Sequence, residues 1–121
     1  MIQQVTADAE VKFGGYRRVD WMWQGDNSTV PAKHTLEVDT ITLNYFPEAG
    51  GTLGRADLIG RDAGGTAVWR LQVVYVEPKK TRHLTFPKGL RLEAGGYVEI
   101  GFTSEGPGTI EASFNGSLVP K

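Results

Sequence analysis

Cysteine is absent from this sequence of 121 residues, and histidine occurs only twice. The absence of cysteine excludes disulfide scaffolds, Cys-ligated zinc, iron–sulfur clusters and thiol nucleophiles together. Two histidines also supply a His-built metal centre poorly. We therefore expect neither a metal site nor a cofactor.

A strong excess of one charge and a long apolar run are missing as well. Thirteen basic and fourteen acidic residues leave a net charge of -1, which disfavours nucleic acid or an anionic membrane as a whole-surface partner. No apolar run is long enough to cross a bilayer, and the first residues lack the pattern of a secretory signal. We expect one domain, 1–121, that is made in the cytoplasm and does not insert into a membrane.

Glycine, by contrast, is abundant, and four glycine doublets divide the chain. They begin at Gly14, Gly50, Gly64 and Gly95. Each doublet predicts a turn, because glycine tolerates the positive φ of tight hairpins. The segments 32–46 and 66–77 contain neither Gly nor Pro and are rich in residues that prefer strands. No helix longer than a single turn is expected.

Between these turns, apolar and polar residues alternate as they do in strands with one face in a core. The parity switches within 36–45, so a bulge or a change of sheet is expected near Thr40. Parity assigns four large aromatic residues to the core: Trp21, Trp23, Trp69 and Tyr75. Such strands in series predict an all-β fold, a two-sheet antiparallel sandwich of about eight strands that is jelly-roll-like rather than immunoglobulin-like.

Groups that could carry out catalysis are poorly placed. None of the four serines stands in a Gly-x-Ser-x-Gly nucleophile elbow, and His34 and His83 are typical of ordinary surface positions. Alternation places the acidic residues of the strands in solvent rather than in a shared cleft: Asp20, Asp39, Glu99 and Glu111. We expect no catalytic residues and no enzyme activity.

The segment Gly25-Asp26-Asn27-Ser28 allows two interpretations. Its oxygen atoms could bind a calcium ion, but the same residues suit a hairpin turn. The spacing of an EF-hand is absent, so we favour the turn and keep a calcium ion near Asp26 as the alternative.

A basic segment spans residues 78–92 and contains no acidic residue. Its members are Lys79, Lys80, Arg82, Lys88 and Arg91, together with His83. Such a segment can dock on an anionic surface, including the acidic side of an identical subunit, or simply protect an edge strand from aggregation. Nucleic acid is disfavoured as the partner, because only Phe86 interleaves the basic residues and its parity predicts burial.

Three tyrosines lie near turns or strand ends and are candidates for exposed contacts: Tyr16, Tyr45 and Tyr97. Flat aromatic rings match the apolar faces of sugars. These residues therefore support an alternative function, a carbohydrate-binding module with a glycan as its partner.

The last third of the chain resembles small jelly-roll modules of bacteriophage and bacterial surface assemblies. The resemblance rests on Phe-Pro-x-Gly-Leu-x-Leu at 86–92, Ala-Gly-x-x-Val-x-Ile at 94–100 and Asn-Gly-x-Leu at 115–118. It implies a non-enzymatic structural, decoration or attachment subunit of a larger phage-derived assembly, in a virion or at a cell surface. It also implies self-association as a homo-oligomer, with a trimer as the expected form. The basic segment, from Lys79 to Arg91, would then lie near an interface or face the assembly that the chain decorates, and Tyr45 and Tyr97 are candidates for the apolar area of the interface.

Overall fold

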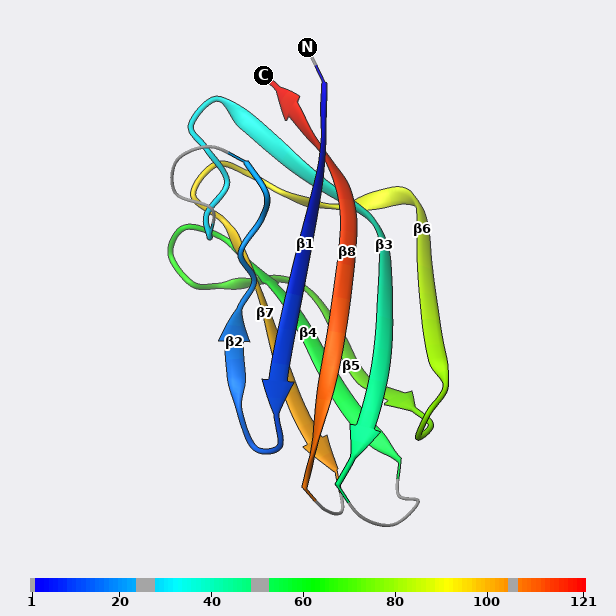
Figure 1. Ribbon diagram of the computed structural model, residues 1–121. Helices are drawn as coiled ribbons and strands as arrows, with labels where there is room; N and C mark the ends of the chain where they lie inside the picture. Colours follow the sequence, from blue (N-terminus) through cyan, green and yellow to red (C-terminus); the bar gives the residue numbers. More distant parts are fainter. Residues whose placement is uncertain (1, 24–27, 49–52, 105–106) are drawn as a thin grey trace.

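The computed structural model describes residues 2–23, 28–48, 53–104 and 107–121. Within these residues the chain forms eight strands (Figure 1), and no helix that could span a bilayer is found among them. The strands are β1 (Gln3–Lys12), β2 (Tyr16–Arg18), β3 (His34–Pro47), β4 (Gly54–Arg61), β5 (Ala67–Val76), β6 (Thr81–Leu92), β7 (Tyr97–Ser104) and β8 (Gly108–Pro120).

The eight strands form two four-stranded antiparallel sheets that pack face to face (Figure 1). One sheet has the order β1-β8-β3-β6 and the other has the order β2-β7-β4-β5. The first strand therefore pairs with the last, the second with the seventh, the third with the sixth, and β4 with β5. This nesting is that of a long hairpin rolled into a sandwich, which is the jelly-roll topology. The predicted fold class is confirmed.

The core lies between the sheets and is built by the alternation that the sequence shows. In β1 every second residue from Val5 to Val11 is buried, and in β8 every second residue from Gly108 to Leu118 is buried. Trp21 and Trp23 are also buried, and their rings stack with centroids 5.7 Å apart. Both were expected in the core.

The parity switch near Thr40 is confirmed as a register shift. Val38 lies opposite Leu90 of β6, whereas Thr40 lies opposite Thr85, so four residues of β6 face a single residue of β3. Gly89 has a φ of 69° at this point, which suits glycine. The strand β6 does not end here but continues as one strand that bends sharply (Figure 1). The partner β3 remains paired on both sides of the bend and holds the strand in its sheet.

Two aromatic residues lie opposite to their expected places. Tyr75 is 49% exposed, while Val74 and Val76 are buried instead. The reason is a second register shift, between Ala56 and Leu58 of β4, which reverses the parity of β5. Tyr45 is fully buried and packs on Phe102 with ring centroids 5.4 Å apart, so its expected role as an exposed contact is wrong. It follows the parity that the shift near Thr40 sets for the rest of β3.

Candidate docking surfaces

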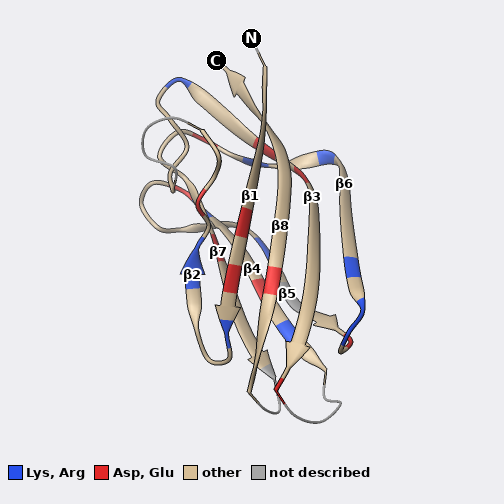
Figure 2. Ribbon diagram, in the orientation of Figure 1, with Lys and Arg blue, Asp and Glu red and all other residues tan. Residues whose placement is uncertain are grey.

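Three carboxylates lie on the solvent-facing side of β1 and β8. The pairing of these strands sets Asp8 opposite Ser113 and Glu10 directly opposite Glu111. The residues between them, such as Ala9 and Ala112, point into the core, so the acidic side chains project outwards. We call Asp8, Glu10 and Glu111 the acidic edge; they are the red bands of β1 and β8 in Figure 2.

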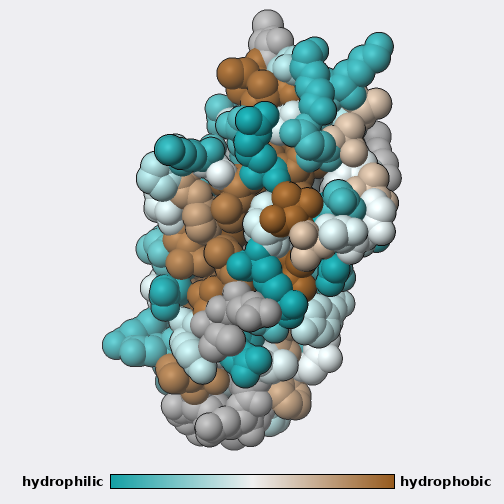
Figure 3. All heavy atoms as spheres, turned by 180° about the vertical axis from the view of Figure 1, so that it is seen from behind, coloured by the Kyte–Doolittle hydropathy of each residue, from teal (hydrophilic) through white to brown (hydrophobic). Residues whose placement is uncertain are grey.

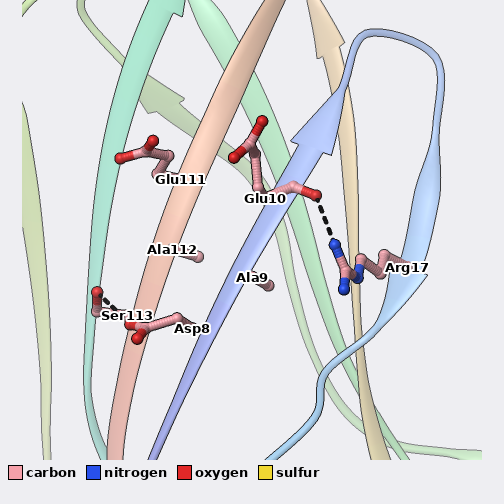
Figure 4. A pocket seen from close by; sticks show the side chains of 7 residues that line it. All are labelled: Asp8, Ala9, Glu10, Arg17, Glu111, Ala112 and Ser113. Carbon is pink, nitrogen blue, oxygen red and sulfur yellow. Dashed lines mark hydrogen bonds between the residues drawn. The ribbon is translucent and has the colours of Figure 1, made fainter.

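The acidic edge borders a shallow depression of about 310 Å³ (Figure 4). Arg17 of β2 also lines it, but its guanidinium Nη1 donates to the backbone carbonyl of Glu10 at 3.3 Å rather than to a carboxylate. Ser113 Oγ donates to Asp8 Oδ1 at 3.0 Å. Within the described part of the chain, no ion pair neutralises any of the three carboxylates.

The carboxylates of the acidic edge are not arranged as a metal site. No group of three or more His, Asp or Glu residues is close enough to hold a metal ion, as far as the described residues go. The side chains stand side by side on neighbouring strands, where directly opposed like charges destabilise the sheet. This arrangement suits the cationic side chains of a partner better than it suits a chelated ion.

The basic segment lies at the opposite edge of the same sheet. The order β1-β8-β3-β6 makes β1 and β6 the two outer strands, and Figure 2 shows acidic residues towards one edge and basic residues along the other. We call the five basic residues of the segment the basic edge: Lys79, Lys80, Arg82, Lys88 and Arg91.

Part of the basic edge is already engaged within the chain. Lys80 Nζ lies 2.7 Å from Glu77 Oε2, and this hydrogen-bonded pair lowers the pKa of the Glu77 carboxyl and raises the pKa of Lys80. Arg91 Nε lies 3.8 Å from Glu37 Oε1. Lys79 and Lys88 are exposed and form no ion pair among the residues that the structure describes. They are the two charges most available to a partner.

Beside the basic edge, the sandwich is open between its two edge strands β5 and β6. Five hydrophobic side chains pack against the core there yet stay only half-buried, and we call them the open flank: Trp69, Leu71, Leu84, Phe86 and Leu90. Seen from behind, hydrophobic side chains gather on this side of the molecule (Figure 3). Arg82 reaches across one end of the opening, where its Nη1 donates to the carbonyl of Tyr75 at 3.2 Å.

Trp69 and Phe86 were predicted to be buried, and both lie half-buried on the open flank, a surface that the sequence did not predict. The sequence does place apolar residues at inward-facing positions of β5 and β6. It does not show that each of these strands is unpaired on one side. That property depends on strand order and could not be read from periodicity.

The two remaining candidate tyrosines do not form a flat platform. Tyr16 is 58% exposed, and its ring covers Gly101 of β7. Tyr97 is half-buried, and the guanidinium of Arg18 sits 3.8 Å above the centre of its ring. One face of the Tyr97 ring is therefore already taken.

The structure does not bring the two histidines together into a site. His34 Nδ1 lies 2.8 Å from the carbonyl of Ala32, and His83 Nδ1 lies 3.0 Å from Thr42 Oγ1. They belong to different strands and each interacts with its own neighbour. Residues 24–27, with Asp26, lie outside the described residues.

Comparison with known proteins locates the fold. No protein-family model and no curated protein matches the sequence. Among solved structures, the chain is similar to the infectious bursal disease virus T13 particle (TM-score 0.51, 11% identity, 99% of this chain and 31% of that chain). It is also similar to the Gx strain of that virus (0.53, 11%, 99% and 33%) and to derived T=1 particles (0.54, 12%, 99% and 31%).

The chain spans about a third of the length of these viral proteins. At such identities the likeness concerns the fold alone.

Proposed function

We propose that this chain is a non-enzymatic structural subunit of a virion-type assembly that acts by self-association and docking. The observation that carries the proposal is the separation of charge on one sheet, with an acidic edge on β1 and β8 and a basic edge at β6. The jelly roll shared with proteins of viral particles supports it, although a fold by itself does not choose a function.

Separated charges favour contacts between copies of the same chain. Complementary potentials guide docking and fix its register. When the two complementary surfaces lie on different sides of a subunit, the contact is heterologous and closes into a ring if the rotation allows. We propose a homotrimer in a decoration or attachment role, derived from a bacteriophage or a bacterial surface assembly, as the resemblance of residues 84–118 implies.

Light scattering at micromolar concentration and low salt tests the proposal. We expect a mass that is a multiple of 13.2 kDa, about threefold for the trimer, and a shift towards the monomer as salt rises. A chain that stays monomeric at high concentration and low salt would overturn self-association.

A glycan array tests the alternative of a carbohydrate-binding module. Saturable binding of one sugar that is lost in Tyr16→Ala, while the oligomeric state is unchanged, would replace the proposal. Tyr16 is the appropriate residue because it is the most exposed of the three candidate tyrosines.

A further inference from the structure

We infer that the open flank and the basic edge beside it form the receiving surface for the acidic edge of a second copy of this chain. This inference rests on the proposed self-association and specifies which surfaces meet. The contact would run head to tail, from the β6 side of one copy to the β1 side of the next.

The first argument is that the large apolar side chains of the open flank are only partly buried. Side chains as large as Trp69 and Phe86 pack against the core but remain half-exposed. A contiguous apolar patch with a polar rim is typical of an interaction site. Covering these residues would add the apolar area that a stable interface requires, since exposed ion pairs contribute little singly.

The second argument is the charge beside this apolar surface. Lys79 lies in the turn just before β6, and Lys88 lies at the bend of β6. Neither has an acidic partner within the described chain, while Lys80 and Arg91 do. Five basic residues lie here beside three acidic ones, Glu77, Glu37 and Asp39, so the net charge next to the open flank is positive and its partner should be acidic.

The third argument is that the same chain carries an acidic surface whose carboxylates form no ion pair within the described residues. Glu10 and Glu111 face each other across two paired strands, and the nearby Arg17 donates to a backbone carbonyl instead. Opposed like charges lower the stability of an isolated sheet, and a cation from a partner would remove that penalty. Phe13 follows β1 directly and is 47% exposed, so it supplies apolar area at this end of the strand.

The fourth argument is geometric. The acidic edge and the basic edge belong to opposite edges of one sheet, so they cannot meet within one copy. They can meet between copies. The acidic edge of each copy then contacts one neighbour, and its basic edge contacts the other. A contact of this kind generates a ring or a filament.

Charge reversal tests this contact with matched variants. The acid-reversed variant is Glu10→Lys with Glu111→Lys, which keeps an opposed like-charge pair and so leaves folding stability little changed. The base-reversed variant is Lys79→Asp with Lys88→Glu; aspartate is used because Lys79 has a φ of 61°, which Asp tolerates. The control is Lys33→Asp, another exposed lysine with a positive φ, at 62°.

Each reversal alone should raise the concentration at which the oligomer half-dissociates by at least about tenfold, because like charges then face each other. Lys33→Asp should leave it unchanged. A swapped chain that carries all four reversals should recover an oligomer of the parental mass. When mixed with the parent, it should sort into separate oligomers, which native mass spectrometry would resolve.

The outcomes separate this inference from the proposed function. If the parent never associates, self-association itself is wrong. If the parent associates but both reversals leave it intact, the contact inferred here is wrong and self-association stands. If the swapped chain has the parental circular dichroism and unfolding midpoint yet stays monomeric, or mixes freely with the parent, the head-to-tail pairing of these two surfaces is also overturned.

Discussion

The two flanks of the sandwich are closed to different degrees. On the β1–β2 flank, residues 19–23 run from one sheet to the edge of the other: the amide of Met22 donates to the carbonyl of Thr6 at 2.8 Å, and Ala7 forms a bridge with Trp21. The amide of Gly14 also donates to the carbonyl of Phe102 at 2.9 Å. Backbone hydrogen bonds thus join the sheets on this flank.

On the β5–β6 flank, the described links lie at one end of the opening, around the turn between the two strands. Pro78 forms a bridge with Tyr45, the amide of Lys79 donates to the carbonyl of Tyr45 at 3.2 Å, and Arg82 donates to the carbonyl of Tyr75. The apolar side chains behind these links stay half-buried. This sandwich is therefore closed on the flank that a segment with buried tryptophans crosses. On the opposite flank, the apolar side chains of the edge strands stay accessible to a partner.

The largest expected effect comes from removing a tryptophan on each flank. Trp21 is 1% exposed and Trp69 is half-buried, while both indole Nε1 atoms are buried without a hydrogen-bond partner in the described structure. Trp21→Ala should lower the free energy of unfolding by about 3–5 kcal/mol, and Trp69→Ala by clearly less. Urea denaturation measures both losses of unfolding free energy. Equal losses would contradict the conclusion that the β5–β6 flank is less closed than the β1–β2 flank.

A smaller effect is expected from adding a methyl group to two glycines. A Cβ at Gly60 would overlap the ring of Trp69, and one at Gly101 would overlap the ring of Tyr16. Gly60→Ala should cost about 1–3 kcal/mol, as overpacking does, because Trp69 must leave its contacts with the core. Gly101→Ala should cost much less, since Tyr16 is 58% exposed and can turn into solvent. The thermal unfolding midpoints of the two variants compare the two losses of stability. A larger loss in Gly101→Ala would show that Trp69 moves out of the way at little cost.

A still smaller effect concerns the acidic edge. Glu10→Gln and Glu111→Gln each remove one of two opposed like charges, so each should raise the free energy of unfolding by on the order of a few tenths of a kcal/mol. The gain should shrink at high salt. Glu77→Gln serves as the control because Glu77 is paired with Lys80 and should show no gain. Denaturation at two salt concentrations, on the dissociated chain, tests this; a loss of stability in either edge variant would contradict it.

The smallest expected effect is a change in the pKa of the Glu77 carboxyl, beside the basic edge. The hydrogen bond and charge of Lys80 lower the pKa of the Glu77 carboxyl. Because the folded value lies below the unfolded one, any stability from the pair is present above the usual carboxyl range and is lost as pH falls through the folded value. In Lys80→Ala the pKa of the Glu77 carboxyl should rise towards the ordinary range of a glutamate, because the hydrogen bond and charge of Lys80 are removed. Carbon chemical shifts measured by NMR across the acidic range report it, and an unchanged pKa would show that the pair is absent in solution.

Local alternation predicted much of the fold. The burial of Trp21 and Trp23, the parity switch near Thr40 and the turns at Gly14 and Gly64 are all present in the structure. These features depend on residues close together in the chain. Tyr75 was misplaced because the register shift that exposes it is a property of β5 and β4 together.

The candidate surfaces were predictable only in part. The basic edge was visible because its five residues lie within the single segment 78–92, which contains no acidic residue. The opposition of Glu10 and Glu111 was not, since it arises only when β1 pairs with β8. The open flank depends likewise on which strands end each sheet.

Local patterns in the sequence are therefore sufficient to predict the all-β character, most inward-facing residues and the single basic segment, because a period of two and turn-forming glycines act over short distances. Tertiary structure alone decided that β1 and β6 are opposite edges of one sheet, that two glutamates face each other, and that one flank stays open. These properties come from pairings between distant segments, and it is strand order that sets which charged and apolar surfaces a second copy would meet.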